Sequence, residues 1–247
     1  MQEIIITGAS RGFGRHVALK LAKPGRCLHL ISRSESADTA SQVIERGAEA
    51  KTWSIDLSRS AEIEKSFSPV LDAIDTKEAG FIGLINNAGT LNPVGPLGKY
   101  DTNEYRAHLE LNYVSPAVLA HLFVKRFQKL PVTKRVLFIG SGASQRPIHG
   151  WSHYCSSKAG VDMLAKTIAL EQDSMDHKVE TAVFNPGRIE TDMQELLRTL
   201  DKEDFPLVDD FIASAKDGRN LPPGQVAEKM VLLFTADNFP HGEITGR

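Results

Sequence analysis

Short apolar runs alternate along the chain with longer segments in which apolar residues recur at helical spacing. The runs are typical of strands that are buried on both faces: Glu3–Thr7, Cys27–Ser32, Ala50–Ile55, Phe81–Ile85, Arg135–Gly140 and Val179–Phe184. The intervening segments predict helices: Phe13–Ala22, Ala37–Arg46, Ala61–Ile74, Thr102–Gln128, Ser152–Gln172 and Gln225–Thr235. This alternation predicts the α/β fold class, a doubly wound parallel sheet with helices on both faces.

One segment, Thr191–Asn220, breaks the alternation with mixed helical signals and several acids. An insertion over the carboxyl ends of the strands explains it, so residues 191–220 are predicted to form a substrate lid. The chain shows no repeat, low-complexity tract or linker. Residues 1–247 are therefore expected to form a single domain.

Composition narrows the classes of partner. The chain is 41% hydrophobic and 24% charged, with a formal net charge of −2, which indicates neither a nucleic-acid nor a membrane partner. Its apolar runs are too short to span a membrane, and no signal peptide is apparent. Cys27 and Cys155 fall in a predicted strand and a predicted helix, so a disulfide is not expected. These features favour a reducing, cytoplasmic location.

A glycine-rich turn joins the first predicted strand to the first helix. Gly8, Gly12 and Gly14 allow a tight turn and a close approach of the backbone to a pyrophosphate, which then meets the N–H groups of a helix start. The position after the first strand gives the motif its specificity and predicts a Rossmann-type sheet. The cofactor contacts predicted here are Gly8, Ser10, Arg11, Gly12, Phe13 and Gly14.

The end of the second strand indicates which dinucleotide binds. Many dinucleotide sites place an acid there for the ribose hydroxyls, but this chain has none before Glu35. Arg33, with Arg11 in the glycine turn, is placed to bind a 2′-phosphate, because guanidinium bonds phosphate oxygens in pairs. NADP(H) is therefore the predicted cofactor, although two solvent-exposed arginines remain an alternative. Asp56 and Leu57, after the third strand, are predicted to meet the adenine.

The strand that ends at Gly140 and the helix that begins at Ser152 carry candidate catalytic residues. Tyr154 and Lys158 are four residues apart and share one helix face. A neighbouring ammonium favours the ionised phenol, so the pKa of Tyr154 is expected to fall toward the range of an acid catalyst. Ser141 could hydrogen-bond the oxygen that Tyr154 protonates. The alternative is an amphipathic helix with a half-buried tyrosine, since the spacing alone is common by chance.

Pro116 lies within the predicted helix Thr102–Gln128 and has no N–H for the carbonyl of Asn112. The helix is predicted to kink there. The freed carbonyl of Asn112 could then hold a water molecule.

Together these motifs resemble the classical short-chain dehydrogenase/reductases. In the order of that family the chain carries Thr7-Gly8-x3-Gly12-x-Gly14, Asn86-Asn-Ala-Gly89, Asn112, Ser141, Tyr154-x3-Lys158 and Pro186-Gly187-x3-Thr191. The resemblance implies a catalytic tetrad of Ser141, Tyr154, Lys158 and Asn112, with a water at Asn112 that links Lys158 to solvent. It also implies cofactor contacts from Asn87, Ala88, Gly89, Tyr154, Lys158, Pro186, Gly187, Ile189, Thr191 and Met193. A homodimer or homotetramer built on Thr102–Gln128 and Ser152–Gln172 is implied as well.

Within this family, three stretches resemble the sepiapterin reductases and the benzil (aromatic diketone) reductases: Ser32–Glu35, Gly150–Cys155 and Pro186–Gln194. Two positions depart from the pattern. Gly140 stands where a serine often precedes the catalytic serine. Gly246 stands where sepiapterin reductases have an acid that binds the pterin, which argues against pterin recognition.

The predicted function is an NADPH-dependent carbonyl reductase that transfers hydride to a ketone or vicinal diketone, with Tyr154 as general acid. The small-molecule carbonyl would lie against Ser141, Tyr154, Trp151 and Met193, although core packing explains the last two equally well. His149 and His153 fit no zinc spacing, so no metal is predicted. The alternatives are an NADP(H)-sensing regulator without turnover and an acyl-carrier-protein ketoreductase.

Overall fold

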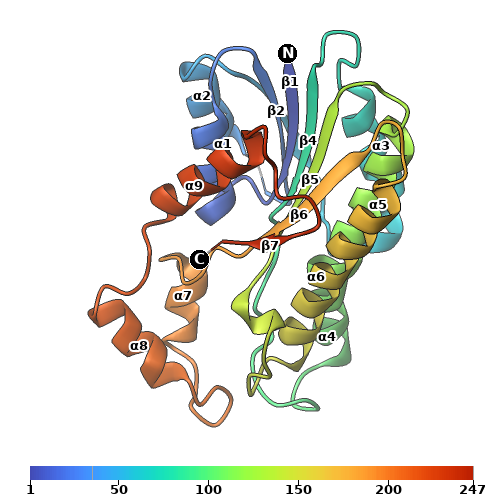
Figure 1. Ribbon diagram of the computed structural model, residues 1–247. Helices are drawn as coiled ribbons and strands as arrows, with labels where there is room; N and C mark the ends of the chain where they lie inside the picture. Colours follow the sequence, from blue (N-terminus) through green and yellow to red (C-terminus); the bar gives the residue numbers. More distant parts are fainter. Residues whose placement is uncertain (35, 247) are drawn as a thin grey trace.

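The computed structural model describes residues 1–34 and 36–246. Its centre is a parallel sheet of seven strands in the order β3-β2-β1-β4-β5-β6-β7, which runs outward in both directions from β1 (Figure 1). The strands are β1 (Gln2–Thr7), β2 (Arg26–Ser32), β3 (Glu49–Ser54), β4 (Phe81–Asn86), β5 (Thr133–Ile139), β6 (Val179–Phe184) and β7 (Ile244–Thr245). This is the predicted doubly wound topology.

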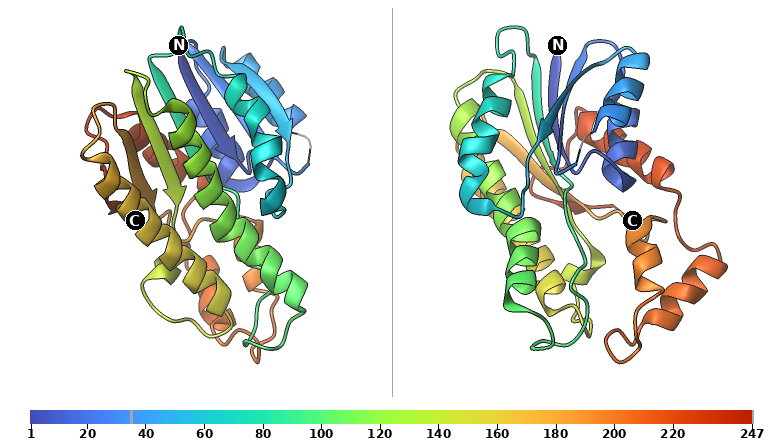
Figure 2. Two further views of the ribbon diagram at one scale, coloured as in Figure 1. Left: turned by 90° about the vertical axis from the view of Figure 1, so that its right-hand side faces the viewer. Right: turned by 180° about the vertical axis from the view of Figure 1, so that it is seen from behind.

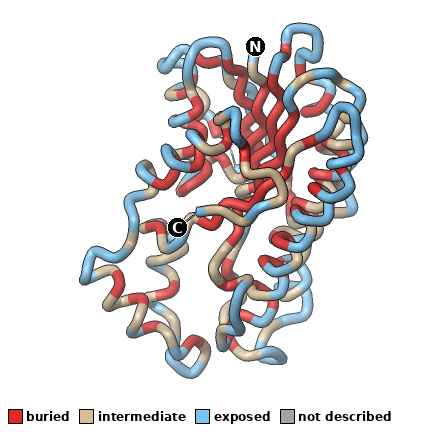
Figure 3. The backbone as a smooth tube through the Cα atoms, viewed as in Figure 1, coloured by how far each residue is buried: buried red, intermediate tan, exposed pale blue. Residues whose placement is uncertain are grey.

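Helices cover both faces of the sheet (Figure 2). One face packs against α1 (Gly12–Leu21), α2 (Ala37–Glu45) and α9 (Pro223–Thr235), and the other against α3 (Ile63–Asp72), α5 (Ser115–Phe127) and α6 (Ser152–Gln172). Alternate residues of a strand serve opposite faces: Ile4 and Ile6 pack on the first side, and Ile5 on the second. The five inner strands β2, β1, β4, β5 and β6 are buried almost throughout, whereas the edge strands β3 and β7 and the outer helix faces are more exposed (Figure 3).

The predicted kink is a turn of π-helix. The segment predicted as one helix is α4 (Thr102–Leu109), a π-turn (Glu110–Val114) and α5. The N–H of Ser115 bonds the carbonyl of Glu110, five residues back, because Pro116 cannot continue the regular ladder. Asn112 lies in the middle of this turn.

The predicted lid contains two short helices, α7 (Asp192–Leu197) and α8 (Val208–Lys216), which lie below the sheet in Figure 1. Its two ends are side by side: the N–H of Glu190 bonds the carbonyl of Leu221, and the N–H of Leu221 bonds that of Arg188. The two ends of the segment are therefore held together. Across the described residues, no helix combines the length and apolar character needed to cross a membrane.

Candidate active site

A cleft of about 1400 Å³ opens at the carboxyl ends of the strands, between the glycine-rich turn and the lid. All but one of the predicted site residues line it: Gly8, Ser10, Arg11, Gly12, Phe13, Gly14, Arg33, Asp56, Leu57, Asn87, Ala88, Gly89, Ser141, Trp151, Tyr154, Lys158, Pro186, Gly187, Ile189, Thr191 and Met193. The exception is Asn112, which lies beneath the surface of the cleft. Several other residues that line the cleft were not predicted from the sequence, among them His108, Arg146, Arg188 and Phe211.

The glycine-rich turn has the shape of a phosphate cradle. A Cβ at Gly14 would lie 2.1 Å from the carbonyl oxygen of Gly8, so only glycine allows this approach. Gly12, at the amino end of α1, has φ +55° and faces open space, because a Cβ there would meet no atom within 4 Å. The side-chain amide of Asn87 donates to the carbonyls of Thr7 (2.9 Å) and Gly8 (3.2 Å), which ties the end of β4 to the turn. The residues present therefore fit a dinucleotide pyrophosphate at a helix N-terminus.

The two predicted phosphate-binding arginines lie at the same end of the cleft. Arg33 approaches Asp56, whose pKa is lowered first by a hydrogen bond from the Ser58 hydroxyl and further by the Arg33 charge. Arg11 reaches across the cleft to Asp192 of α7, with 3.2 Å between Nη1 and Oδ2. Both partners of that pair are mostly exposed, so the pair contributes little stability and leaves the guanidinium available to a phosphate. Glu35 lies outside the described residues.

Tyr154 and Lys158 project from α6 beside Ser141, which follows β5. The Ser141 hydroxyl accepts a bond from the N–H of Ala143 (3.2 Å) and is hydrogen-bonded to the Tyr154 hydroxyl. Lys158 donates to the carbonyl of Ile139 (2.8 Å), and its Nζ lies 5.8 Å from the centre of the Tyr154 ring. The structure thus brings together the three residues that the sequence placed in one catalytic group.

The predicted lowering of the Tyr154 pKa is wrong for this structure. Burial raises the pKa of Tyr154, and the hydrogen bond from Ser141 only partly opposes it. Lys158 does not offset the burial because its ammonium bonds the Ile139 carbonyl instead of the phenol. Burial lowers the pKa of Lys158 to about 8. The phenol is therefore protonated at neutral pH, which is the state that a proton donor requires.

Asn112 supports the loop that follows β4. Its side-chain oxygen accepts from the N–H of Thr90 (2.9 Å), and its amide donates to the Thr90 carbonyl (2.7 Å) and to Nε2 of His108 (2.8 Å). Burial lowers the pKa of His108 to about 3, so the ring is neutral and its Nε2 can accept this bond while Nδ1 donates to the carbonyl of Asn92 (2.9 Å). His108 is one helical turn before Asn112, and no motif marks it.

Comparison with known proteins agrees with this geometry. The model of the family described as short chain dehydrogenase matches residues 2–202. The chain belongs to the short-chain dehydrogenase family. Benzil reductase ((S)-benzoin forming) of Bacillus cereus is 34% identical over 99% of this chain and 98% of its own length. Sepiapterin reductase of Mus musculus is 33% identical over 96% of this chain and 93% of its own. The predicted family and branch are confirmed.

Solved structures of other proteins show the same fold. A 3-oxoacyl-[acyl-carrier protein] reductase from Brucella melitensis in complex with NAD has a TM-score of 0.83 at 21% identity, covering 99% of this chain and 94% of that one. A putative 2-deoxy-D-gluconate 3-dehydrogenase from Agrobacterium tumefaciens with bound NADP has a TM-score of 0.82 at 24% identity, with the same coverage of each chain. At these identities the likeness concerns the fold alone.

The other end of the cleft of this short-chain dehydrogenase has an aromatic wall. Trp151 stacks on Phe205 of the lid, with 4.9 Å between ring centres, and meets the Tyr154 ring at 5.1 Å. Phe211 also lines the cleft, with 6.2 Å between its ring centre and that of Trp151. Trp151 therefore serves in both predicted ways, since it lines the cleft and packs in the core of the lid; Met193 also lines the cleft and packs against the same core. Neither Phe205 nor Phe211 belongs to a sequence motif, and only this packing places them in the aromatic wall.

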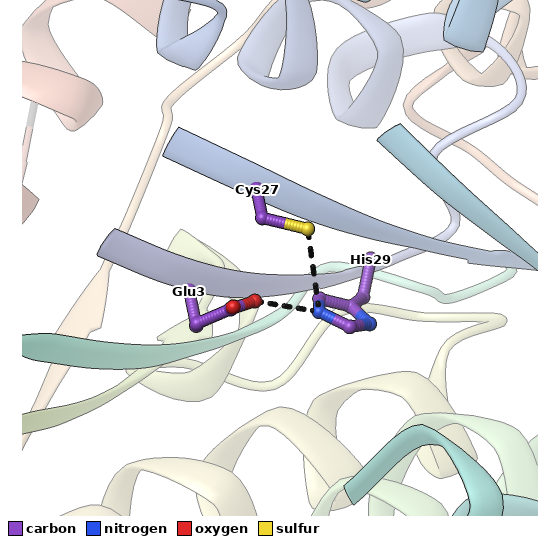
Figure 4. Close-up of side chains that lie close together, drawn as sticks. All are labelled: Glu3, Cys27 and His29. Carbon is purple, nitrogen blue, oxygen red and sulfur yellow. Dashed lines mark hydrogen bonds and ion pairs between the residues drawn. The ribbon is translucent and has the colours of Figure 1, made fainter. Parts of the chain in front are cut away.

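Among the described residues, one group of three side chains has ligand atoms close enough to share a metal ion: Glu3, Cys27 and His29 (Figure 4). They lie on β1 and β2, outside the cleft. Nε2 of His29 is 2.8 Å from a Glu3 oxygen and 3.8 Å from the Cys27 sulfur. Burial raises the pKa of Cys27 to about 12, so its thiol stays protonated. The group forms a buried hydrogen-bonded cluster within the apolar sheet.

Proposed function

We propose that this short-chain dehydrogenase is an NADPH-dependent carbonyl reductase acting on aromatic ketones or vicinal diketones. The observation that carries the proposal is the position of the buried Tyr154 hydroxyl, next to Ser141 and beside the aromatic wall. A carbonyl oxygen that meets both hydroxyls would be oriented by Ser141 and protonated by Tyr154. Bound NADPH would supply the hydride to the carbonyl carbon.

Two further residues support this reaction. Lys158 would hold the hydroxyls of the nicotinamide ribose and resupply Tyr154 with a proton. Asn112 would hold a relay water at its carbonyl, within the π-turn. At the same end of the cofactor, Thr191 and the Pro186–Gly187 turn would hold the nicotinamide carboxamide.

We expect NADPH to be preferred to NADH by at least about tenfold in kcat/KM, the effect of one or two charge-assisted contacts to a phosphate. The support is Arg33 and Arg11 at one end of the cleft, with no acid between β2 and position 35. Arg33→Ala is expected to remove most of the preference, measured as the ratio of kcat/KM for the two cofactors. Arg126→Ala is the matched control, because it changes an exposed arginine of α5, and should leave the ratio unchanged. Equal efficiency of wild type with both cofactors would contradict the proposal.

We expect benzil to be reduced better than sepiapterin. A pterin carries several polar ring groups, and each one buried without a partner costs about 1–3 kcal/mol. Gly246 has no carboxylate, and an acidic residue would not fit at this position, because its Cβ would lie 2.2 Å from the carbonyl oxygen of Asn185. Two lid acids that could take its place are already paired: Asp209 with Lys202 (2.7 Å), and Asp210 with Arg188.

The measurement is kcat/KM for both substrates with NADPH. If sepiapterin is favoured by tenfold or more, this assignment is wrong. Asp210→Asn would then identify the acid, since it would lower sepiapterin reduction and spare benzil, whereas Asp217→Asn, an exposed lid-end control, would change neither.

A homodimer or homotetramer is proposed as well. The outer face of α6 carries exposed Met163 (64% exposed) and Leu170 (74% exposed), which fit an interface between copies. Sedimentation at micromolar concentration is expected to show a dimer or tetramer, and Leu170→Lys to shift it toward monomer; a monomeric wild type would refute the proposal. Both cysteines are unpaired, which supports a reducing, cytoplasmic location.

A further inference from the structure

The helix face that bears Tyr154 and Lys158 continues one turn further to Asp162. The three residues are four positions apart and are all buried, at 8%, 8% and 6% exposure respectively. A carboxylate this deeply buried is costly unless it is paired or hydrogen-bonded. The reaction proposed above gives Asp162 no part, so its place beside the catalytic residues needs an explanation.

One oxygen of Asp162 holds the turn that carries Ser141. The side-chain amide of Gln145 donates to Oδ2 of Asp162 (3.1 Å). In the same turn, the Ser144 hydroxyl donates to the carbonyl of Ser141 (2.9 Å). The carboxylate therefore fixes α6 and the Ser141 turn relative to each other, and with them the separation of the Ser141 and Tyr154 hydroxyls.

The other oxygen, Oδ1, is buried and has no hydrogen-bond partner in the described structure. It faces Gly140: a Cβ at that position would lie 3.5 Å from it. No side chain at position 140 can satisfy this oxygen, because the same Cβ would lie 2.5 Å from Cγ1 of Val183. The charge of Asp162 acts on Lys158, the buried cation one turn earlier on the same helix face.

We propose that Asp162 is a positioning residue that braces the Ser141 turn through Gln145 and keeps Lys158 in its charged form. This inference rests on the proposed reductase function. It also involves Gly140: the close approach of Val183 requires glycine there, and this leaves the Asp162 oxygen without a side-chain partner from that position.

The charges around these groups determine the expected pH dependence. Burial lowers the pKa of Lys158 to about 8, and Asp162 opposes this shift. The other titratable neighbours of Lys158 are Tyr154, which is protonated, and His108, which is neutral. Burial raises the pKa of Asp162, and this shift is opposed by hydrogen bonds from Ser144 and Gln145 and by the charges of Lys166 and Lys158. Removing the Asp162 charge must therefore lower the pKa of Lys158 further, so that Lys158 loses its proton at a lower pH.

Asp162→Asn is the first test, because it keeps the shape of the side chain and removes its charge. The alkaline limb of kcat/KM for ketone reduction is expected near pH 8 in wild type and about one pH unit lower in the variant. A purely structural role would lower the rate at every pH and leave the limb in place. An unmoved limb would overturn the electrostatic part of the proposal.

Gln145→Ala is the second test, because it removes the brace and leaves the Asp162 charge. Gln145 is exposed, so the variant is expected to fold. The kcat of this variant should fall several-fold, while KM for NADPH and the position of the alkaline limb stay unchanged. A kcat equal to that of wild type would show that Gln145 does not hold the Ser141 turn in place. Glu171→Gln, an exposed carboxylate of the same helix, is the control that should change nothing. If Asp162→Asn does not fold, Asp162→Glu takes its place: it keeps the charge and should keep the limb.

A binding measurement separates this inference from the proposed function. The dissociation constant of NADPH, measured by fluorescence from pH 6 to 9, should rise at a lower pH in Asp162→Asn than in wild type, because Lys158 would hold the ribose. Wild type that reduces no carbonyl compound would refute the reductase proposal but leave this comparison decisive for Asp162. Identical binding curves would refute the inference.

Discussion

Tyr154→Phe is expected to lower kcat for ketone reduction by about 10³-fold, within the range for loss of a positioned general acid. The substitution removes one hydroxyl from a buried ring that packs against Trp151. Ring packing is kept, so the fold should be retained. Ser141 would still orient the carbonyl, but no proton donor would face it. The dissociation constant of NADPH, measured by fluorescence titration, should change by less than about threefold.

Tyr100→Phe is the control for this experiment. Its hydroxyl makes a long bond to the carbonyl of Gly150 (3.4 Å) and does not line the cleft, so turnover should stay near the wild-type value. A Tyr154→Phe variant that keeps most of its turnover would exclude the acid role. It would favour the alternative function, a non-catalytic regulator that senses NADP(H).

The architecture could be predicted from the sequence because a parallel sheet covered on both faces needs almost wholly apolar strands, and these stand out from helical periodicity. The two-residue strand β7 was missed, since Ile244–Thr245 is too short to show any period. The interruption near Asn112 was predicted from the missing N–H of Pro116. That it takes the form of a π-turn was not, because the form depends on the packing of α4 and α5.

The candidate site was predictable where backbone geometry demands particular residue types, as at Gly14 or in the Tyr154–Lys158 spacing. It was not predictable where a role arises from tertiary contacts. His108 gains its role from the Asn112 amide, and Phe205 from stacking on Trp151. The predicted direction of the Tyr154 pKa shift was wrong for the same reason. The spacing places Lys158 nearby, but it cannot show that the ammonium of Lys158 bonds another group.

Gly14→Ala is expected to destabilise the protein by about 1–3 kcal/mol, the usual cost of forcing extra atoms into a packed site, and to weaken NADPH binding at least a hundredfold. The sign is informative, because alanine inside a helix is normally favoured over glycine by about 0.5–1 kcal/mol. Here the added Cβ would lie 2.1 Å from the Gly8 carbonyl oxygen and 2.4 Å from the Asn87 amide. The first of these atoms belongs to the backbone of the cradle and can yield only if the turn opens.

Gly224→Ala is the matched control for this substitution. It also lies in the first turn of a helix, α9, but its Cβ would meet only the His16 ring at 3.7 Å, an ordinary contact. Urea unfolding should therefore show a loss of stability for Gly14→Ala and a small gain for Gly224→Ala. If both variants gain stability, the close approach of α1 to the Gly8 carbonyl is not a constraint on the fold. In that case only cofactor binding would require glycine in the cradle. NADPH binding, measured on the same two variants, would then be the only property that distinguishes Gly14→Ala from Gly224→Ala.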